Sequence, residues 1–437
     1  MDERTHLLPA RGLVIALISL AFLAGCRGVS LVPSGSLSQS SSATNPADMG
    51  ETIPKHVITA DYFGSIYSNP RLRGSKKVPP SEAAKYLDWG DVVPADQQTT
   101  ADAGMKTLFY YRPTFQGRGD PFYKSDQFAH SCSGHRIAIY KRDGGGHPMY
   151  LMSRSPKQAG LAADYIKQVL QQNAFDVVFE DDAGFAPYQL GIHPCNLQAS
   201  EWIDRDARLE KEVHAKQLPS SLNAFTEDAQ HVWTQNQQSL DLALHHEGGL
   251  MEQCYSSNSN PQVYFISDTL WVAQENTEIA VVGGNKLFFC YVRNYSPAKA
   301  QIAERIYDYA SFLLSYRPQF AVLWETYLTP SNFHVLPESG FVALHPLKAQ
   351  PTDITQLKSG GVYVREYSDC YYRGKLLGPC AAIVNPSSST ATSNPLYGKY
   401  RHTLVLSGGG VTDGGTVKFT GPTAPKSVQR DRAYVAL

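Results

Sequence analysis

The chain has 437 residues, of which 42% are hydrophobic and 11% aromatic, enough for one large folded domain and a smaller second one. Its 39 lysines and arginines nearly balance 40 aspartates and glutamates, so the net charge is −1. This balance argues against a nucleic-acid partner, and it offers no polybasic attraction to an anionic membrane surface.

A short apolar run near the N-terminus predicts a lipoprotein signal peptide over residues 1–25. Arg4 and Arg11 precede the run LVIALISLAFLAG, which is too short for an ordinary membrane span. The run ends in Leu-Ala-Gly-Cys and resembles the lipobox of bacterial lipoproteins, in which the cysteine, here Cys26, receives a diacylglyceryl group. The resemblance implies a membrane attachment through lipid only and, with Arg27 after the cysteine, the outer membrane. An ordinary signal peptide with a chance cysteine is the alternative.

The next segment, 26–54, is rich in Ser, Pro and Asn and nearly free of aromatic residues. Such a composition is typical of a flexible linker that cannot bury a core of its own. We therefore predict a tether between the lipid and a folded part that consists of a barrel over 55–350 and a β domain over 351–437.

Between residues 55 and 350, short apolar or β-branched runs alternate with stretches of helical periodicity. Near-continuous apolar runs are typical of parallel strands that are covered on both faces. Helices are predicted over 156–173 and 296–316, each beginning near a proline. The predicted strands are HVITADY, MKTLFYY, HPMYLMS, FDVVFED, GLMEQCY, TEIAVVG, KLFFCYV and FAVLWET. Eight strands with intervening helices predict an α/β fold, a (β/α)8 TIM barrel.

Beyond residue 350 the helical periodicity disappears, and short strands are joined by turns of Gly, Pro and Ser. A series of short strands with such turns is typical of antiparallel sheets. The segment 351–437 therefore predicts a small C-terminal antiparallel β-sandwich.

The six cysteines that remain after the lipidated one suit an oxidising compartment. One pair flanks a short polar segment and a second pair lies in loop sequence. The predicted disulfides are Cys370–Cys380 and Cys132–Cys195. Cys254 and Cys290 lie in strand-like runs and are interpreted as buried thiols. The absence of C-x-x-C spacing argues against a structural zinc site.

Several predicted strands end in carboxylates, and in a barrel of this kind the active site lies at the C-terminal ends of the strands. The residues concerned are Asp61, Glu180, Asp181, Asp182, Glu252 and Glu325. If they converge, they form one acidic pocket. No Ser-His-Asp spacing, P-loop or dinucleotide fingerprint competes with this pocket, and no cofactor is predicted.

Two carboxyl groups on neighbouring strands suit cleavage of a glycosidic bond, since one protonates the leaving oxygen while the other attacks the sugar or activates water. Strand alternation places Asp181 on the face of Val177 and Phe179. Glu252 has apolar neighbours in the sequence, which favours the protonated form of a general acid. We predict Asp181 as nucleophile or stabilising carboxylate and Glu252 as general acid, with Asp182 as the alternative to Asp181.

Further residues near the strand ends are predicted to contact the substrate. They are Asp61, Tyr62, Asp182, Trp324 and Glu325. Trp324 would stack on a sugar ring, although a tryptophan in an apolar strand is more often part of the core. The segment 183–218 is long for a loop and is predicted to roof the pocket. His245 and His246 point about 100° apart on a helix, so no metal site is predicted.

The stretch FDVVFEDDAG resembles the fourth-strand motif D-G-[VI]-F-x-D of a glycosyl hydrolase-like family of bacterial TIM barrels, the fifteenth in its series. The motif begins at Asp176 and ends at Asp181, and Val177 stands where glycine is usual. The segments YASFLLSYRPQFAVLWETY, VLPESGFVALHPLKAQ, YVREYSDCYYRGKLLGPCAAIVNPSS and LVLSGGGVTDGGTV share the resemblance, which spans most of 55–420. It implies the fold more than an activity, because the family has none assigned. The strand-four aspartate and strand-five glutamate are also similar, by analogy, to retaining barrels of the alpha-amylase type.

Together these features predict a lipid-anchored glycoside hydrolase of the cell envelope that acts on an oligosaccharide or polysaccharide. The alternative is a non-catalytic surface lipoprotein that binds carbohydrate with a degenerate site. Binding without turnover across a panel of glycans would favour that alternative. A deacetylase would require a metal, for which the sequence offers no ligand set.

Overall fold

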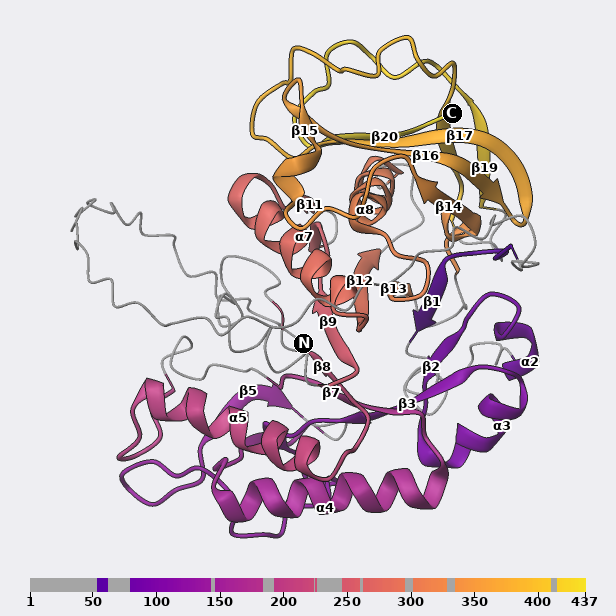
Figure 1. Cartoon of the computed structure of the whole chain (residues 1–437). Coiled ribbons are helices and arrows are strands. Elements are labelled where there is room, and N and C mark those ends of the chain that lie inside the picture. Colours follow the sequence, from indigo (N-terminus) through magenta and orange to yellow (C-terminus); the bar gives the residue numbers. More distant parts are fainter. Residues whose placement is uncertain are drawn as a thin grey trace, which may run out of the picture. The chain divides into compact units, whose positions relative to one another are not determined.

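A computed structural model gives the fold of the folded part of the chain (Figure 1). It describes residues 53–61, 79–142, 146–183, 192–223, 225, 246–259, 262–294, 302–327, 335–409 and 415–437. The predicted signal peptide, Cys26 and Tyr62 lie outside these ranges. Within them, none of the helices combines the length and the apolar character needed to span a bilayer.

Eight parallel strands close into a barrel with helices between them, which confirms the predicted (β/α)8 fold. The order around the barrel is β1-β13-β12-β9-β8-β7-β3-β2. The strands are β1 (Ile58–Asp61), β2 (Trp89–Asp91), β3 (Lys106–Tyr111), β7 (Val177–Glu180), β8 (Ser220–Asn223), β9 (Gly248–Glu252), β12 (Leu287–Asn294) and β13 (Ala321–Tyr327). Because β1 pairs with β13, the barrel leaves no sheet edge open.

Two of the eight predicted strands do not belong to the barrel. HPMYLMS contains β6 (Pro148–Leu151), which pairs with β4 (Phe115–Gln116) and β5 (Ala138–Arg142) in a three-stranded sheet inserted after β3. TEIAVVG lies in helix α7 (Asp268–Gly283). Both predictions were wrong because a short apolar run has the same composition in a buried strand, an edge strand and a buried helix.

Two barrel strands, β2 and β8, went unpredicted. β2 is the three-residue stretch Trp-Gly-Asp and β8 is Ser-Ser-Leu-Asn, and neither contains a run of apolar or β-branched residues. Each nevertheless pairs in parallel with a strand on both sides. β8 consequently separates β7 from β9, so the strands of Asp181 and Glu252 are not direct neighbours as predicted.

The predicted helix over 156–173 is confirmed as α4 (Pro156–Asn173). Ser155 caps its N-terminus, where Oγ accepts a hydrogen bond of 3.2 Å from the amide of Gln158. α8 (Ile302–Ser315) lies within the second predicted helix, 296–316. The remaining helical segments are α2 (Pro80–Ala83), η3 (Pro94–Asp96), α3 (Gln97–Asp102), α5 (Ala199–Ala215), η7 (Pro337–Gly340) and η8 (Ile354–Leu357).

Helix α5 changes the interpretation of the segment 183–218. The 17 residues 199–215 of this segment are helix rather than loop, and α5 packs against α4 in the outer layer of the barrel. The predicted roof is therefore wrong for residues 199–215, while 184–191 lie outside the described ranges. Trp202 is buried against the inserted sheet, where it contacts an apolar cluster that includes Phe115 and Leu151.

The C-terminal region is antiparallel β structure, as predicted. Within the described residues its strands form one seven-stranded sheet of order β14-β16-β17-β20-β18-β19, with β15 paired to β16. The strands are β14 (Phe341–Pro346), β15 (Lys358–Ser359), β16 (Val362–Tyr372), β17 (Lys375–Asn385), β18 (Thr403–Ser407), β19 (Thr416–Gly421) and β20 (Arg432–Ala436). A separate hairpin, β10 (Ser256–Ser259) and β11 (Gln262–Phe265), follows β9.

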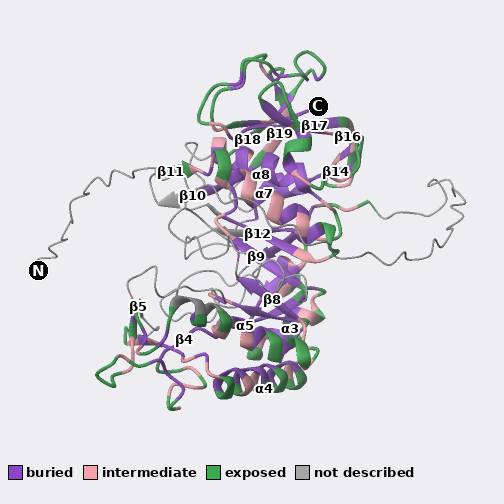
Figure 2. Cartoon of the chain, turned by 60° about the vertical axis from the view of Figure 1, so that its left-hand side comes forward, coloured by how far each residue is buried: buried purple, intermediate pink, exposed green. Residues whose placement is uncertain are grey.

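Helix α8 is shared between the barrel and this sheet. It contacts β12 on one side and β16, β17, β18 and β20 on the other, and in Figure 2 it is almost wholly buried. α4, by contrast, exposes one side to solvent in the same view. Arg365 of β16 donates to the Leu314 carbonyl over 2.7 Å, and Tyr309 of α8 donates to the carbonyl of Phe341. The sheet therefore completes the burial of a barrel helix.

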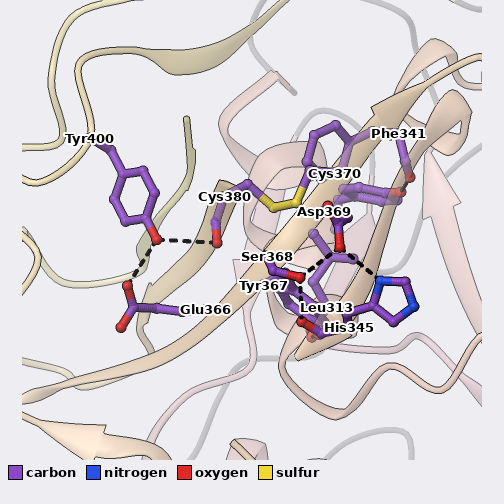
Figure 3. Close-up of a disulfide and its surroundings, with 11 residues drawn as sticks. Leu313, Phe341, His345, Glu366, Tyr367, Ser368, Asp369, Cys370, Cys380 and Tyr400 are labelled. Atoms are coloured by element: carbon purple, nitrogen blue, oxygen red, sulfur yellow. Dashed lines mark hydrogen bonds and ion pairs between the residues drawn. A yellow bond between two sulfur atoms is a disulfide. The ribbon is translucent and has the colours of Figure 1, made fainter. Parts of the chain in front are cut away.

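Three disulfides connect the described residues: Cys132–Cys195, Cys254–Cys290 and Cys370–Cys380. The first and third confirm the predicted pairs. The third joins β16 to β17 (Figure 3). Cys254 and Cys290 are bonded to each other, so their interpretation as plain buried thiols was wrong. This disulfide joins the end of β9 to the neighbouring strand β12.

Candidate active site

The interior of the barrel changes from apolar to polar toward the C-terminal ends of its strands. Its apolar layers contain Ala60, Trp89, Leu108, Val177, Phe179, Leu250, Phe289, Tyr291, Val322 and Trp324. Alternate residues of a strand share a face, so the next interior positions follow two residues later. On five consecutive strands, β2, β3, β7, β8 and β9, these positions are Asp91, Tyr110, Asp181, Asn223 and Glu252. Polar side chains from five of the eight strands thus line the barrel mouth.

One side-chain amide joins the two predicted catalytic carboxylates. Asn223 donates from Nδ2 to Asp181 Oδ1 over 2.7 Å and to Glu252 Oε2 over 3.2 Å. These two oxygens therefore lie no farther apart than 5.9 Å, the sum of 2.7 and 3.2 Å. The structure brings Asp181 and Glu252 together across β8, and Asn223 of that strand bridges them through hydrogen bonds.

Asp181 accepts two further hydrogen bonds. Tyr110, from the neighbouring strand β3, donates its hydroxyl to Oδ2. The backbone amide of Asp182 donates to Oδ1 over 2.9 Å, in a turn where Asp182 has a φ of 53°. Tyr110, the Asp182 amide and Asn223 all donate to the Asp181 side chain, so its carboxyl oxygens act as acceptors. Asp182, the predicted alternative nucleophile, contacts Asp181 through its backbone.

Tyr110 stays a donor over the accessible pH range. Burial and the negative charge of Asp181 raise the pKa of Tyr110 well above its ordinary value of 10. A phenol in this setting keeps its proton at any pH at which the protein would work. Tyr110 therefore fixes the position of one Asp181 oxygen.

Asp91 adds another carboxyl group on the other side of Asp181, and Asp61 acts on it as a nearby negative charge. Asp61 ends β1 and is 5% exposed, and Asp91 ends β2 and is 2% exposed. Burial, and then the negative charges of Asp181 and Asp61, raise the pKa of Asp91 well above its ordinary value of 3.8. Asp91 is an additional acidic residue of the mouth. Asp61 directly follows the interior residue Ala60, so strand alternation places it on the opposite face of β1, and its contact with a substrate stays a prediction.

Glu180, next to Asp181 in the sequence, lies on the opposite face of β7. Its side chain is fully buried and accepts a hydrogen bond of 2.6 Å from Ser220 Oγ. Burial raises the pKa of Glu180 to about 7, partly offset by that hydrogen bond and by the charge of Arg154. The alternation predicted for FDVVFEDD is therefore observed: Asp181 faces the barrel mouth and Glu180 the layer between barrel and helices.

The expected stacking role of Trp324 is wrong in this structure. Its side chain is 0% exposed, and its ring contacts Phe179 and Phe289 at centroid distances of 5.1 and 5.7 Å. Trp324 belongs to the apolar floor beneath the polar layer and offers no face to a sugar. Glu325 pairs in register with Val292 on β12, but its side chain is outside the described part, as is Tyr62.

Sequence reasoning missed three members of the polar layer: Asp91, Tyr110 and Asn223. Asp91 and Asn223 end the two strands that show no apolar run, so no predicted strand end pointed to them. Tyr110 could have been found, because it stands on the predicted strand MKTLFYY two residues after Leu108. Across the described ranges, no group of three or more His, Cys, Asp or Glu side chains is arranged to hold a metal ion.

No protein-family model and no curated protein matches the chain. Among solved structures it is similar to Ega3 of Aspergillus fumigatus in complex with galactosamine, with 11% identity, 64% of this chain and 94% of that chain covered, and a TM-score of 0.38. The glycoside hydrolase domain of PelA from Pseudomonas aeruginosa is 11% identical, with 57% of this chain and 91% of that chain covered and a TM-score of 0.38. The alpha-amylase of Geobacillus thermoleovorans complexed with acarbose is 10% identical, with 87% of this chain and 97% of that chain covered and a TM-score of 0.38. Similarities of this strength are too low to assign a family or an activity. The resemblance to the fifteenth glycosyl hydrolase-like family stays a prediction.

Proposed function

We propose that the protein hydrolyses a glycosidic bond of an oligosaccharide or polysaccharide with retention of anomeric configuration. The observation that carries the proposal is the Asn223 bridge, which limits the two bridged oxygens of Asp181 and Glu252 to 5.9 Å. Retaining glycosidases hold their carboxyl groups about 5–5.5 Å apart, whereas inverting enzymes need roughly 6.5–9.5 Å to admit a water molecule.

The contacts of the two carboxylates suggest their roles. In the first step, an oxygen of Asp181 attacks the anomeric carbon while Glu252 gives its proton to the departing glycosidic oxygen. Asp181 Oδ2 accepts the bond from Tyr110 and keeps a lone pair for this attack. In the second step, Glu252 takes a proton from water, the water oxygen attacks the anomeric carbon, and Asp181 is released as a carboxylate. No cofactor is required.

The test compares Asp181→Asn and Glu252→Gln with the wild-type chain on a panel of oligosaccharides. Each substitution is isosteric and should reduce kcat by a factor of about 10³ or more while leaving the unfolding temperature nearly unchanged. NMR of the first product formed should show the anomeric configuration of the substrate. Azide should restore turnover to a variant that lacks the nucleophile. Full activity in both variants, or an inverted product, would contradict the assignment.

The same panel tests the alternative function. Saturable binding of a glycan by the wild-type chain, with no product released after prolonged incubation, would favour a carbohydrate-binding protein. In that case Asp181→Asn would alter affinity and nothing else. The carboxyl groups at the mouth would then serve recognition alone.

Lipid anchoring at Cys26 is a second part of the proposal, supported by the sequence Leu-Ala-Gly-Cys at the end of a short apolar run. A lipid on Cys26, followed by the Ser- and Pro-rich segment, would hold the enzyme at the outer membrane of the cell envelope. Cells that express the protein should incorporate labelled palmitate into it. Labelling that survives Cys26→Ala would refute this anchoring.

A further inference from the structure

Two residues at the base of the inserted sheet are hydrogen-bonded to the turn that follows Asp181. Thr114 stands just before β4 and Arg154 shortly after β6, and both are fully buried. The amide of Met152 donates to the Thr114 carbonyl over 2.8 Å, which closes the base of the insertion. Neither Thr114 nor Arg154 belongs to a barrel strand, yet both reach the end of β7.

Their hydrogen bonds form a chain that runs from the insertion to the turn. Arg154 donates from Nη2 to Thr114 Oγ1 over 2.5 Å, and Thr114 donates from Oγ1 to the Asp182 carbonyl over 2.5 Å. Arg154 also donates to the Ala183 carbonyl over 3.4 Å. Because a guanidinium can only donate, the Thr114 hydroxyl accepts from Arg154 and directs its own proton to Asp182.

The peptide group between Asp182 and Ala183 is therefore held on both sides. Thr114 bonds its carbonyl oxygen, and its N–H donates to the Asn223 carbonyl over 3.1 Å. Asp182 has a φ of 53°, in the left-handed region that a residue with a Cβ seldom adopts. In this conformation its own amide donates to Asp181 Oδ1 over 2.9 Å. The bonds on both sides thus maintain the conformation through which Asp182 orients the Asp181 carboxylate.

A purely structural role for Arg154 is the alternative. Its charge opposes the effect of burial on the pKa of Glu180, so Arg154 also serves as a counter-charge for that residue. A counter-charge does not account for the bond from Thr114 to Asp182, however. Arg154 has a φ of 52°, so the first and the last residue of the hydrogen-bonded chain both have a left-handed backbone. Such conformations are concentrated at functional sites, where the surroundings hold them in place.

We propose that Thr114 and Arg154 are positioning residues, which hold the Asp182–Ala183 peptide group and thereby orient Asp181 for attack on the anomeric carbon. This inference rests on the proposed glycosidase function and extends its machinery to the inserted sheet. Loss of either side chain should slow the chemical step more than it weakens substrate binding, because a displaced nucleophile is felt mainly in the transition state.

Three threonine variants test this role on a glycan that the wild-type chain hydrolyses. Thr114→Val removes the hydroxyl and keeps the shape of the side chain, whereas Thr114→Ser keeps the hydroxyl. Thr107→Val is the matched control. Thr107 is also fully buried, and its hydroxyl donates to Asp176 Oδ2 over 3.1 Å at the opposite end of β3 and β7. Denaturant unfolding measures the stability that each variant loses.

Thr114→Val should lower kcat about tenfold and change KM less than about twofold, and Thr114→Ser should recover most of the loss. Inactivation by a fluorosugar that traps the covalent intermediate should slow by the same factor, since it reports the attack of Asp181 directly. Thr107→Val should lose stability but keep its kcat. A wild-type kcat in Thr114→Val, or equal kinetic losses in Thr114→Val and Thr107→Val, would overturn the inference but not the proposed function.

A double-mutant cycle tests whether Arg154 acts through Thr114. Arg154→Lys keeps the positive charge but loses the planar set of donors, and it should lower kcat by a similar factor. The variant with both Arg154→Lys and Thr114→Val should be about as slow as the slower single variant. Losses that multiply would overturn the role of Arg154, and if Arg154→Lys does not fold, Thr114→Val and Thr114→Ser decide the inference. A wild-type chain that hydrolyses no glycan would overturn both the inference and the proposed function.

Discussion

The Asn223 side chain donates to Glu252 over 3.2 Å and is the only strand-end amide that touches both predicted catalytic groups within the described structure. Since β8 is inserted between their strands, Asn223 sets the distance between nucleophile and acid. A side chain of this kind acts by positioning, and its removal should affect the reaction more than the binding of substrate.

We therefore expect Asn223→Ala to lower kcat by about 10²-fold with a much smaller change in KM, because misplacement by an ångström is costly in the transition state. Asn223→Gln, which keeps the donor on a longer chain, should recover part of the loss. Steady-state kinetics on one defined oligosaccharide, with circular dichroism as a check of folding, measures both. A change in KM alone would show that Asn223 binds substrate and does not position the carboxylates.

Asp91→Asn should stabilise the protein. The substitution removes a buried carboxyl group that has two negative neighbours, and the gain should be about 1–2 kcal/mol at neutral pH. Because the pKa of Asp91 is raised in the folded state, the wild-type chain loses stability as pH rises above the ordinary value of 3.8, and the variant does not. The gain should thus vanish at pH 3 and grow toward neutrality. Denaturant unfolding at several pH values measures this gain in unfolding free energy, with Asp102→Asn, on the exposed side of α3, as control. If Asp91→Asn were less stable than the wild-type chain at pH 7, the prediction would be wrong.

The whole molecule should be most stable at mildly acidic pH. Burial raises the pKa of Glu278 to about 8, although Tyr255 donates a hydrogen bond to it, and Glu180 titrates at about 7 in the fold. Both groups titrate near 4.5 in the unfolded chain, so between pH 4.5 and these values the folded protein holds protons that the unfolded chain has lost. Stability therefore falls with rising pH, by at most about 1.4 kcal/mol per pH unit for each proton, and levels off above pH 8.

Thermal unfolding from pH 4.5 to 9 tests this dependence. Glu278→Gln keeps the size and the hydrogen-bonding capacity of the side chain and removes its titration, so the slope should become shallower. The conservative surface variant Asp102→Asn should leave the slope unchanged. A stability that rises from pH 5 to pH 8 would show that the buried carboxyl groups are ionised in the fold.

The disulfide Cys254–Cys290 should matter for activity as well as for stability. Its two cysteines are 36 residues apart, and closing a loop of that length stabilises a fold by about 3–4 kcal/mol. Cys254 follows Glu252 by two residues. We therefore expect the variant in which Cys254 and Cys290 are both replaced by serine to be less stable and to have a kcat that is several-fold lower. The corresponding variant of Cys370 and Cys380, in the C-terminal sheet, should lose stability only. Equal kinetic losses in both variants would point to general unfolding.

The sequence predicted the architecture of the barrel, and the two carboxylates that Asn223 bridges, because of particular signals. FDVVFEDD combines a continuous apolar run with a carboxylate cluster, and strict alternation was enough to separate Asp181 from Glu180. The strands β2 and β8 carry no such run, since they are held by pairing on both sides and need little propensity of their own. Asp91 and Asn223, which end these two strands, could therefore not be predicted as site residues from the sequence. Tertiary packing, not local composition, also decided that TEIAVVG is helical and that Trp324 is buried.

The contacts of helix α8 with both the barrel and the C-terminal sheet have a consequence for truncation of the chain. In a barrel without the C-terminal sheet, one side of this helix would be exposed to solvent. Here Tyr309 is bonded to the start of the sheet, Arg305 is paired with Glu338 of η7, and the same arginine reaches the Gly408 carbonyl over 3.1 Å. Loss of residues 351–437 would expose the apolar side of α8 and remove the Gly408 acceptor of Arg305, although Arg305 and Glu338 would both remain. Barrel and sheet therefore depend on each other for folding, and we expect neither to be stable alone.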